Sequence, residues 1–380
     1  MIHLPADATA LNVALVYNLK KEDPTSDDSN GLPGHDESNT LALVTPSRQR
    51  LSDTYAEWDT IETIEAVRWA LAELHQVSLI EANEDVFAKL SVLRPDIVFN
   101  IAEGLHGVSR EAQIPSMLEF LRIPYTGSDA QTLATCLDKA RTKEVLSYYG
   151  IPSPHFGVIS KISELAGVSV KFPSIVKPLH EGSSKGIHSS SVVRNWDELW
   201  QQINSVIHTY GEPALVEEFL EGREFTVALL GNGEDVCVLP IVEIRFDSLP
   251  PGVNPVYSFE AKWIRDQRGA PLDIFECPAN ISTLLRQEIE TLCRKAFRVL
   301  RCRDWCRIDV RLDADGIPNV LELNPLPGIL PAPEEHSCLP KAALAAGMSY
   351  DQMIQNVLHI AAKRYGMFNG QLSAAQPGAA

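Results

Sequence analysis

The chain has no long apolar run and no excess of basic residues. Its 380 residues include 33 Lys and Arg against 50 Asp and Glu, which gives a formal net charge of −17 at pH 7. Without a basic excess to neutralise phosphates, we expect neither nucleic acid nor an anionic membrane surface as a partner. No apolar stretch approaches membrane-spanning length, and the first residues lack the basic and apolar segments of a secretory signal. We therefore expect a cytoplasmic protein that acts on small molecules.

Cysteine is scarce, and two common nucleotide-binding motifs are missing. The seven cysteines are scattered and odd in number, which favours reduced, mostly buried thiols over disulfides. Cys302 and Cys306 lie close together with Cys293 upstream, but no fourth ligand is near, so zinc is disfavoured. The chain has neither a P-loop nor the His-Arg-Asp and Asp-Phe-Gly motifs of protein kinases. Both of those nucleotide-binding classes are therefore excluded.

What the chain does contain is a hairpin near its C-terminal end. Residues 306–312 and 317–324 both alternate in character, as strands with one buried face do. Between them lies Asp315-Gly316, a strong signal for a two-residue hairpin turn. We therefore predict an antiparallel pair of strands centred on that turn.

The predicted register gathers four polar side chains on one face of this hairpin. Asp309 falls opposite Glu322, and Arg307 falls opposite Asn324, because side chains along a strand alternate between faces. Carboxylate and amide oxygens beside an arginine suit a magnesium ion that bridges phosphate oxygens. The alternative is a solvated sheet face with a cross-strand ion pair, which four polar groups beside a hydrophobic strand make the weaker interpretation. The pattern favours a metal–nucleotide site.

A second segment is typical of phosphate binding. Residues 174–178 read as a strand that carries Lys177, and the Gly- and Ser-rich stretch 181–186 follows. Such a loop can bring backbone N–H groups and hydroxyls against phosphate oxygens, and Lys177 can reach the same phosphates. By itself the loop is weak evidence, because any flexible surface turn has a similar composition.

A third segment is acidic. Residues 214–219 read as a strand whose backbone and side-chain oxygens can accept hydrogen bonds from an adenine amino group, and Glu224 can hold ribose hydroxyls. The alternative is an acidic strand end with exposed glutamates. The order of the three segments, rather than any one of them, favours a nucleotide site.

The two ends of the chain have different patterns. Strands at 11–19, 77–80 and 96–101 alternate with helices, which predicts a doubly wound parallel sheet in the first third. One helix is predicted over 130–149, and short antiparallel strands follow it, including one at 187–193.

The complete set of motifs resembles the ATP-grasp superfamily, and within it the D-alanine–D-alanine ligase family. The similarity extends from about Pro124 to Tyr365. The motifs are Leu137-Asp138-Lys139-Ala140-Arg141-Thr142-Lys143; Ile175-Val176-Lys177-Pro178 with Glu181-Gly182-Ser183-Ser184; Val216-Glu217-Glu218-Phe219 with Glu221-Gly222-Arg223-Glu224-Phe225; and Arg307-Ile308-Asp309 with Glu322-Leu323-Asn324-Pro325-Leu326-Pro327-Gly328.

The resemblance implies an α/β, in part α+β, ATP-grasp fold with three domains. An N-terminal α/β domain with a doubly wound parallel sheet is expected over 1–126, with a mobile loop at about 20–55. A central subdomain (127–222) and a C-terminal catalytic domain (223–366) would clasp ATP, and 367–380 would be a flexible tail. The resemblance also suggests a homodimer.

The resemblance further implies roles for individual residues. Asp309, Glu322 and Asn324 would bind two Mg²⁺ ions, with Mn²⁺ as an alternative. Arg307, Ser183 and the backbone at Gly328 would act in catalysis. Nucleotide binding would involve Lys139, Lys177, Glu181, Gly182, Ser183, Ser184, Glu217, Glu218, Phe219, Leu220, Glu224 and Lys262.

Such a site activates a carboxylate. The substrate carboxylate attacks the γ-phosphate of ATP to give an acyl phosphate, and an amine then displaces phosphate to form an amide. The expected substrates are amino acids or other small carboxylates. Ser337 matches the family position that binds the carboxylate of the second amino acid.

The departures from the family pattern fall in the amino-acid pocket. The glutamate that usually binds the first D-alanine's ammonium has no recognisable counterpart, and Trp263 stands where a tyrosine is common. Glu103 and Glu111 are candidate ammonium anchors, and Arg110 is a candidate carboxylate anchor. Their alternative role is salt bridging at a helix start.

Three functions therefore remain open. D-alanyl-D-alanine synthesis is the first hypothesis, and a ligase of specialised metabolism with a different acceptor is the close alternative. A non-catalytic nucleotide-binding regulator is disfavoured, because the metal ligands, Arg307 and the lysines are all present.

Overall fold

The structure is a computed structural model that describes residues 10–21, 55–247, 254–258, 274–332 and 337–367. Most of the predicted mobile loop at 20–55 lies outside these residues, as does nearly all of the predicted tail. Lys262 and Trp263 also lie outside them.

The N-terminal region contains a parallel sheet covered on both faces. Its strand order is β2-β1-β3, as predicted for a doubly wound arrangement. Val13 and Leu15 pack with helices α2 and α10 (Tyr350–Arg364), whereas Ala14 and Val16 pack with α3 and α4 on the other face. The elements are β1 (Asn12–Tyr17), α2 (Ile61–Ala72), β2 (Gln76–Glu81), α3 (Val86–Leu93), β3 (Ile97–Asn100), the 3₁₀ turn η1 (Arg110–Ala112) and α4 (Gln113–Leu121).

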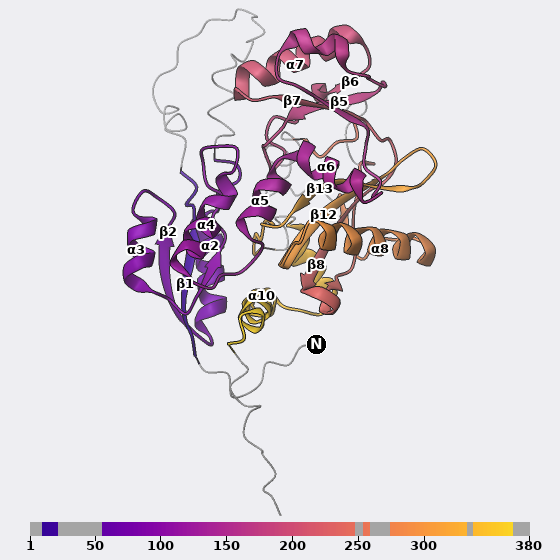
Figure 1. The fold of residues 1–380 in the computed structure, drawn as a ribbon. Coiled ribbons are helices and arrows are strands. Elements are labelled where there is room, and N and C mark those ends of the chain that lie inside the picture. Colours follow the sequence, from indigo (N-terminus) through magenta and orange to yellow (C-terminus); the bar gives the residue numbers. More distant parts are fainter. Residues whose placement is uncertain (1–9, 22–54, 248–253, 259–273, 333–336, 368–380) are drawn as a thin grey trace, which may run out of the picture.

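The central sheet is antiparallel, with the order β4-β7-β5-β6, and helix α7 packs on it (Figure 1). The strand predicted over 187–193 is wrong for its first five residues, since only the last two pair with β5. The elements are β4 (Phe156–Ile159), η2 (Ile162–Gly167), β5 (Ser174–Pro178), η3 (Ser189–Ser191), β6 (Val192–Val193), α7 (Trp196–Tyr210) and β7 (Ala214–Glu218).

The third sheet has the main strand order β11-β10-β8-β12-β13, with β9 paired to β8. Helix α8 covers one face, while α9, α10 and the N-terminal region pack on the other (Figure 1). Trp305 joins the two regions, because its buried ring meets Phe99 of β3 with centroids 5.6 Å apart. The elements are β8 (Glu224–Gly231), η4 (Gly233–Asp235), β9 (Cys237–Val238), β10 (Val242–Ile244), β11 (Phe275–Glu276), α8 (Thr283–Val299), β12 (Asp304–Leu312), β13 (Pro318–Asn324), α9 (Cys338–Ala345) and α10 (Tyr350–Arg364).

The single helix predicted over 130–149 is two helices, α5 (Ala130–Leu137) and α6 (Lys139–Tyr148). They are separated at Asp138, whose extended backbone (φ −80°, ψ 98°) ends the first helix. Its carboxylate accepts the N–H groups of Ala140 and Arg141 and so caps the second helix. The break places Lys139 at the first position of α6.

The hairpin of β12 and β13 has the predicted pairing but not the predicted turn. Asp309 pairs with Glu322 and Arg307 with Asn324, as expected. The connection, however, has five residues (313–317) instead of two. This difference shifts the pairing near the turn by one residue. A β-bulge at Leu321 corrects the shift, because Val310 pairs with Val320 whereas Asp309 pairs with Glu322.

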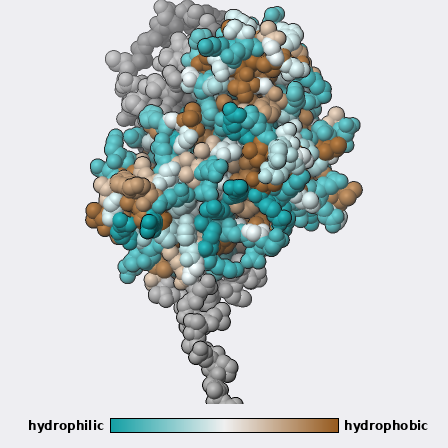
Figure 2. Space-filling model, in the orientation of Figure 1, coloured by the Kyte–Doolittle hydropathy of each residue, from teal (hydrophilic) through white to brown (hydrophobic). Residues whose placement is uncertain are grey.

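The surface in Figure 2 is largely hydrophilic, with separate hydrophobic patches. Within the described part of the chain, no helix combines the length and apolar character needed to span a bilayer. All seven cysteines are free thiols and four are buried, as the sequence predicts. The three sheets fall within the three predicted segments, and the domain boundaries themselves stay predictions.

Candidate active site

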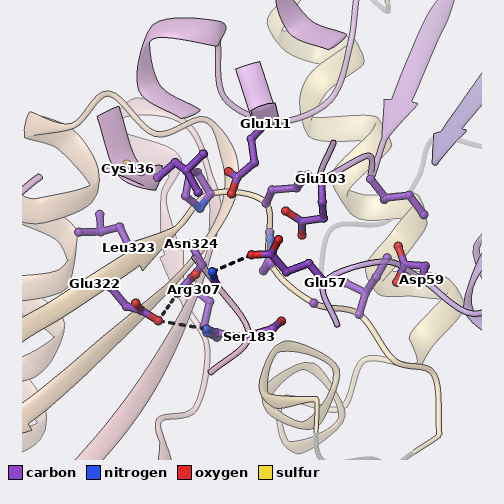
Figure 3. Close-up of a pocket in the computed structure, with 18 of the residues that line it drawn as sticks. Glu57, Asp59, Glu103, Glu111, Cys136, Ser183, Arg307, Glu322, Leu323 and Asn324 are labelled. Atoms are coloured by element: carbon purple, nitrogen blue, oxygen red, sulfur yellow. Dashed lines mark hydrogen bonds and ion pairs between the residues drawn. The ribbon is translucent and has the colours of Figure 1, made fainter. Parts of the chain in front are cut away.

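Two adjoining cavities lie where the three sheets approach each other. The larger cavity, of about 350 Å³, opens between the central and third sheets. The smaller cavity lies between the third sheet and the loops that follow β3 of the N-terminal region (Figure 3). Ser183, Arg307, Glu322 and Gly328 line both, so the point where the cavities meet is also where the predicted catalytic groups gather.

One part of the larger cavity is apolar and suits a flat aromatic ring. Phe219 and Leu220 contribute to it from the segment after β7, as the sequence predicts for adenine binding. Other apolar lining residues come from both sheets, from the loop after β5 and from the segment before residue 259: Ile175, Ile187, Ile244, Val256, Phe275 and Leu321.

The next part holds a buried ion triplet. Glu217 lies between two lysines, with its carboxylate oxygens 2.7 Å from the Lys177 ammonium and 2.9 Å from that of Lys143. Burial alone would lower the pKa of Lys177, but Glu217 reverses this and raises it. The ion pair with Glu217 therefore keeps Lys177 charged on the cavity wall. The Glu217 carboxylate is itself engaged by the two lysines. The predicted contact between Glu217 and adenine stays a prediction.

The metal-ligand candidates lie on one face of the third sheet. The Arg307 guanidinium is 3.0 Å from an Asp309 carboxylate oxygen and 3.9 Å from one of Glu322. The Asn324 amide nitrogen lies 3.4 Å and 3.5 Å from Asp309 and Glu322 oxygens. Two carboxylates and an amide within this reach match the oxygen ligands of magnesium. Among the described residues no group of three His, Cys, Asp or Glu side chains can hold a metal, so substrate oxygens would have to complete the shell.

The two carboxylates have opposite pKa shifts. Burial would raise the pKa of Glu322, but Lys139, Lys177 and Arg307 together lower it to about 2. For Asp309, burial outweighs the attraction of Arg307, and its pKa rises. The Lys139 ammonium lies 3.9 Å from a Glu322 oxygen and also donates to the Glu181 carbonyl.

Glu224 and Glu218 also line the larger cavity. Glu224 accepts a 2.7 Å hydrogen bond from Arg311, whose guanidinium stacks 4.7 Å from the Phe219 ring centroid. Burial raises the pKa of Glu224. Glu218 forms an ion pair with Lys171. Arg311 was not singled out from the sequence, because it looks like one more alternating strand residue.

The loop after β5 lies at the junction of the cavities. Ser183 and Ser184 both have left-handed backbones, with φ of 49° and 61°. The Ser184 hydroxyl donates to the Tyr257 carbonyl at 2.8 Å. The Gly182 N–H donates to Glu57 at 2.7 Å, and a Cβ at this glycine would lie 2.6 Å from the same Glu57 oxygen. A side chain at this position would therefore displace the Glu57 carboxylate from the loop.

Glu57 was missed by the sequence reasoning, which found no counterpart of the family's first glutamate. It lies just after a long polar stretch, and no local pattern marks it. Arg110 holds it in place through two 2.8 Å hydrogen bonds and also donates to Glu181 at 3.2 Å. Lys185 pairs with Glu181 at 3.0 Å. Arg110 lines neither cavity, so its predicted contact with a substrate carboxylate has no support in this geometry.

Comparison with known proteins supports the family resemblance that the sequence motifs indicate. Residues 146–359 match the family model described as D-ala D-ala ligase C-terminus. The D-alanine–D-alanine ligase of Bordetella petrii is 35% identical over 286 residues, which is 75% of this chain and 81% of that protein. An uncharacterized protein of Sinorhizobium fredii is 35% identical over 317 residues, 81% of this chain and 90% of that protein.

The chain belongs to the D-alanine–D-alanine ligase family. It is an ATP-dependent ligase that joins a carboxylate to an amine in a peptide bond. The fold is ATP-grasp: the D-alanine–D-alanine ligase of Bacillus anthracis, solved in complex with ATP, superimposes with a TM-score of 0.65 and 21% identity. That match covers 94% of this chain and 99% of the other.

The amino-acid end of the ligase contains the remaining predicted residues. Ser337, at the start of α9, lines the larger cavity and donates to the Gly328 carbonyl at 2.8 Å. Glu103 and Glu111 line the smaller cavity on the side of the N-terminal region. Figure 3 shows their carboxylates and that of Glu57 turned toward a common space.

Proposed function

We propose that this ligase activates the carboxylate of one amino acid in the smaller cavity and joins it to the amine of a second amino acid held near Ser337. The proposal rests on one observation. Arg307 and Glu322, with Lys139 beside them, lie between a cavity fitted to a nucleotide and a cavity large enough only for a small molecule. D-alanyl-D-alanine, the product that the names of the relatives give, is the reference reaction.

In the first step, a carboxylate oxygen of the donor attacks the γ-phosphorus of ATP, and the bond to the β-phosphate oxygen breaks. The products are an acyl phosphate and ADP. Lys139 and Lys177 offset the phosphate charge, and the raised pKa of Lys177 keeps it protonated. Bound magnesium would be held by Asp309, Glu322 and Asn324, and would neutralise the charge that develops on the phosphate oxygens.

In the second step, the acceptor amine attacks the acyl carbon, phosphate leaves, and the nitrogen loses a proton. Arg307 faces the developing oxyanion with a planar fork of donors, and the backbone at Gly328 lies beside it. Ser337 holds the acceptor carboxylate.

Water must be kept from the acyl phosphate during both steps. The loop of Gly182, Ser183 and Ser184 lies over the junction of the cavities and is already joined to Tyr257, so we assign it this role. Lys262 and Trp263, to which the resemblance assigns phosphate and substrate contacts, lie outside the described residues. Glu57, beside this loop, takes the place of the glutamate that binds the donor's α-ammonium.

The test measures the release of phosphate from ATP in the presence of magnesium, with amino acids supplied singly and in pairs. Mass spectrometry identifies the product. A pair that yields phosphate together with a dipeptide supports the proposal. ATP turnover without a coupled product, or no turnover with any pair, would contradict it.

We also propose that the ligase acts in the cytoplasm as a homodimer, as the resemblance suggests. Light scattering of the purified chain tests the second statement, and a molecular mass near 42 kDa would contradict it, because one chain has a mass of 41.9 kDa.

A further inference from the structure

The side of the smaller cavity next to the N-terminal region carries a carboxylate with no partner. Glu111 is only 9% exposed and lines the cavity. Neither a hydrogen bond nor an ion pair involves its side chain within the described residues. The Glu103 side chain likewise has no such partner in that part of the chain. Buried carboxylates are normally paired, because an isolated charge loses its hydration without compensation.

The cations near these two glutamates are already engaged. Arg110 uses its donors on Glu57, Glu181 and the His180 carbonyl. Lys185 pairs with Glu181, and Lys139 lies against Glu322 and the Glu181 carbonyl. Among the described residues, therefore, no cation is left to match Glu103 and Glu111.

The two carboxylates also disfavour each other's charge. Burial raises the pKa of Glu111 to about 8, against a lowering by Arg110. Burial, followed by repulsion from Glu111, raises the pKa of Glu103 well above its ordinary value. A ligand that brings positive charge to this space would relieve both effects.

The position of the pair identifies the substrate that it would contact. The smaller cavity reaches Arg307, Glu322 and Lys139, where the donor carboxylate is activated, whereas Ser337 lines only the larger cavity. A molecule that reaches both Arg307 and Glu111 is therefore the donor and not the acceptor. The proposed function assigns its α-ammonium to Glu57, whose carboxylate also accepts from Arg110 and Gly182, and so leaves Glu103 and Glu111 to its side chain.

We propose that the donor is an amino acid with a second amine on a short side chain, held by Glu103 and Glu111. This inference rests on the proposed ligase function and names its donor class.

The first test compares donors that differ only in this charge, with D-alanine present as acceptor. The probes are both enantiomers of 2,3-diaminopropionate, 2,4-diaminobutyrate and ornithine, each against a neutral amino acid of similar length and against glutamine. We expect one diamino acid to exceed its neutral counterpart about 100-fold or more in kcat/KM, because a buried charge pair contributes that much discrimination. A preference for alanine, or for glutamine as a neutral hydrogen-bonding side chain, would overturn the inference.

The second test uses Glu111→Gln, which keeps the shape of the side chain and removes its charge. The variant should lose about 100-fold in kcat/KM for the diamino acid, as expected when one member of a buried pair is neutralised, with the KM for ATP unchanged. Glu84→Gln is the matched control, since Glu84 is an exposed glutamate in the same region. If Glu111→Gln does not fold, Glu103→Gln gives the same comparison.

The outcomes distinguish the donor assignment from the proposed ligase function. If neutral donors are ligated best and Glu111→Gln changes nothing, the donor assignment is wrong and the ligase function stands. If no pair of amino acids releases phosphate, the ligase function fails and the donor assignment with it. Calorimetry without ATP gives an independent measurement: the diamino acid should bind the wild type and lose about 100-fold in affinity for Glu111→Gln.

Discussion

The two ends of this active site treat buried charge in opposite ways. At the phosphate end, Glu217 and Glu322 lie among Lys139, Lys143 and Lys177, with distances from 2.7 to 3.9 Å, and the pKa of Glu322 falls to about 2. At the amino-acid end, Glu111 has no matching cation among the described residues, and its pKa rises to about 8.

The difference shows which end is complete without its ligand. The phosphate end is a preorganised network whose charges already stabilise one another, so nucleotide binding requires little rearrangement of protein charge. At the amino-acid end, the raised pKa of Glu111 favours its neutral form at pH 7, and a cationic substrate would take the place of that proton.

The largest expected effect on activity comes from a substitution at the phosphate end. Glu322→Gln removes a proposed metal ligand and a negative charge close to Lys139, while Lys177 keeps its ion pair with Glu217. We expect phosphate release to fall by more than about 100-fold, which exceeds the usual cost of losing an outer-shell partner. The measurement is steady-state turnover beside Glu288→Gln, an exposed control on α8. Activity within tenfold of wild type would remove Glu322 from the metal site.

A smaller effect tests how the two ends are joined. In Gly182→Ala the new Cβ would lie 2.6 Å from the Glu57 carboxylate and must displace it. We expect the KM for the donor amino acid to rise by about 10-fold to 100-fold, as misplacement by about 1 Å typically costs. The KM for ATP should change little. Gly167→Ala is the control, because nothing lies within 4 Å of its Cβ position. Equal increases in the KM for the donor and in the KM for ATP would show that the substitution affects both ends of the site.

The smallest effect concerns stability at the amino-acid end. Folding raises the pKa of Glu111 from 4.5 to about 8, so the folded state binds this proton more tightly, and stability falls as pH rises between those values. Glu111→Gln abolishes that loss. We expect the variant without ligand to melt several °C above wild type at pH 8, with a much smaller difference at pH 5. Calorimetric melting of both proteins checks this, and a variant that is less stable at pH 8 would contradict the raised pKa.

The phosphate end could be predicted because its residues follow local patterns. Arg307, Asp309, Glu322 and Asn324 lie in one hairpin, where a period of two places them on one face. Lys177 precedes a loop of distinctive composition. These relations need only a strand and a turn, and both are visible in one short stretch of sequence.

The contacts of Glu57 and Arg110 at the amino-acid end could not be predicted, because they form through tertiary packing. Glu57 is 125 residues from Gly182, and Arg110 is 70 residues from the His180 carbonyl that it contacts. The break at Asp138 was also missed, since its helix-capping role depends on an extended backbone that the surrounding helical pattern conceals. No period in the sequence encodes such contacts.

The bulge in β13 has a consequence for nucleotide choice. It turns two consecutive side chains, Leu321 and Glu322, into the larger cavity, while Val320 and Leu323 on either side enter the core. In the proposed complex, Leu321 contacts the base and Glu322 binds the metal ion. The two contacts are therefore separated by a single peptide unit. A change at position 321 that accommodated a different purine would also displace the ion. In that complex, we therefore expect a substitution at position 321 to change base preference and turnover together.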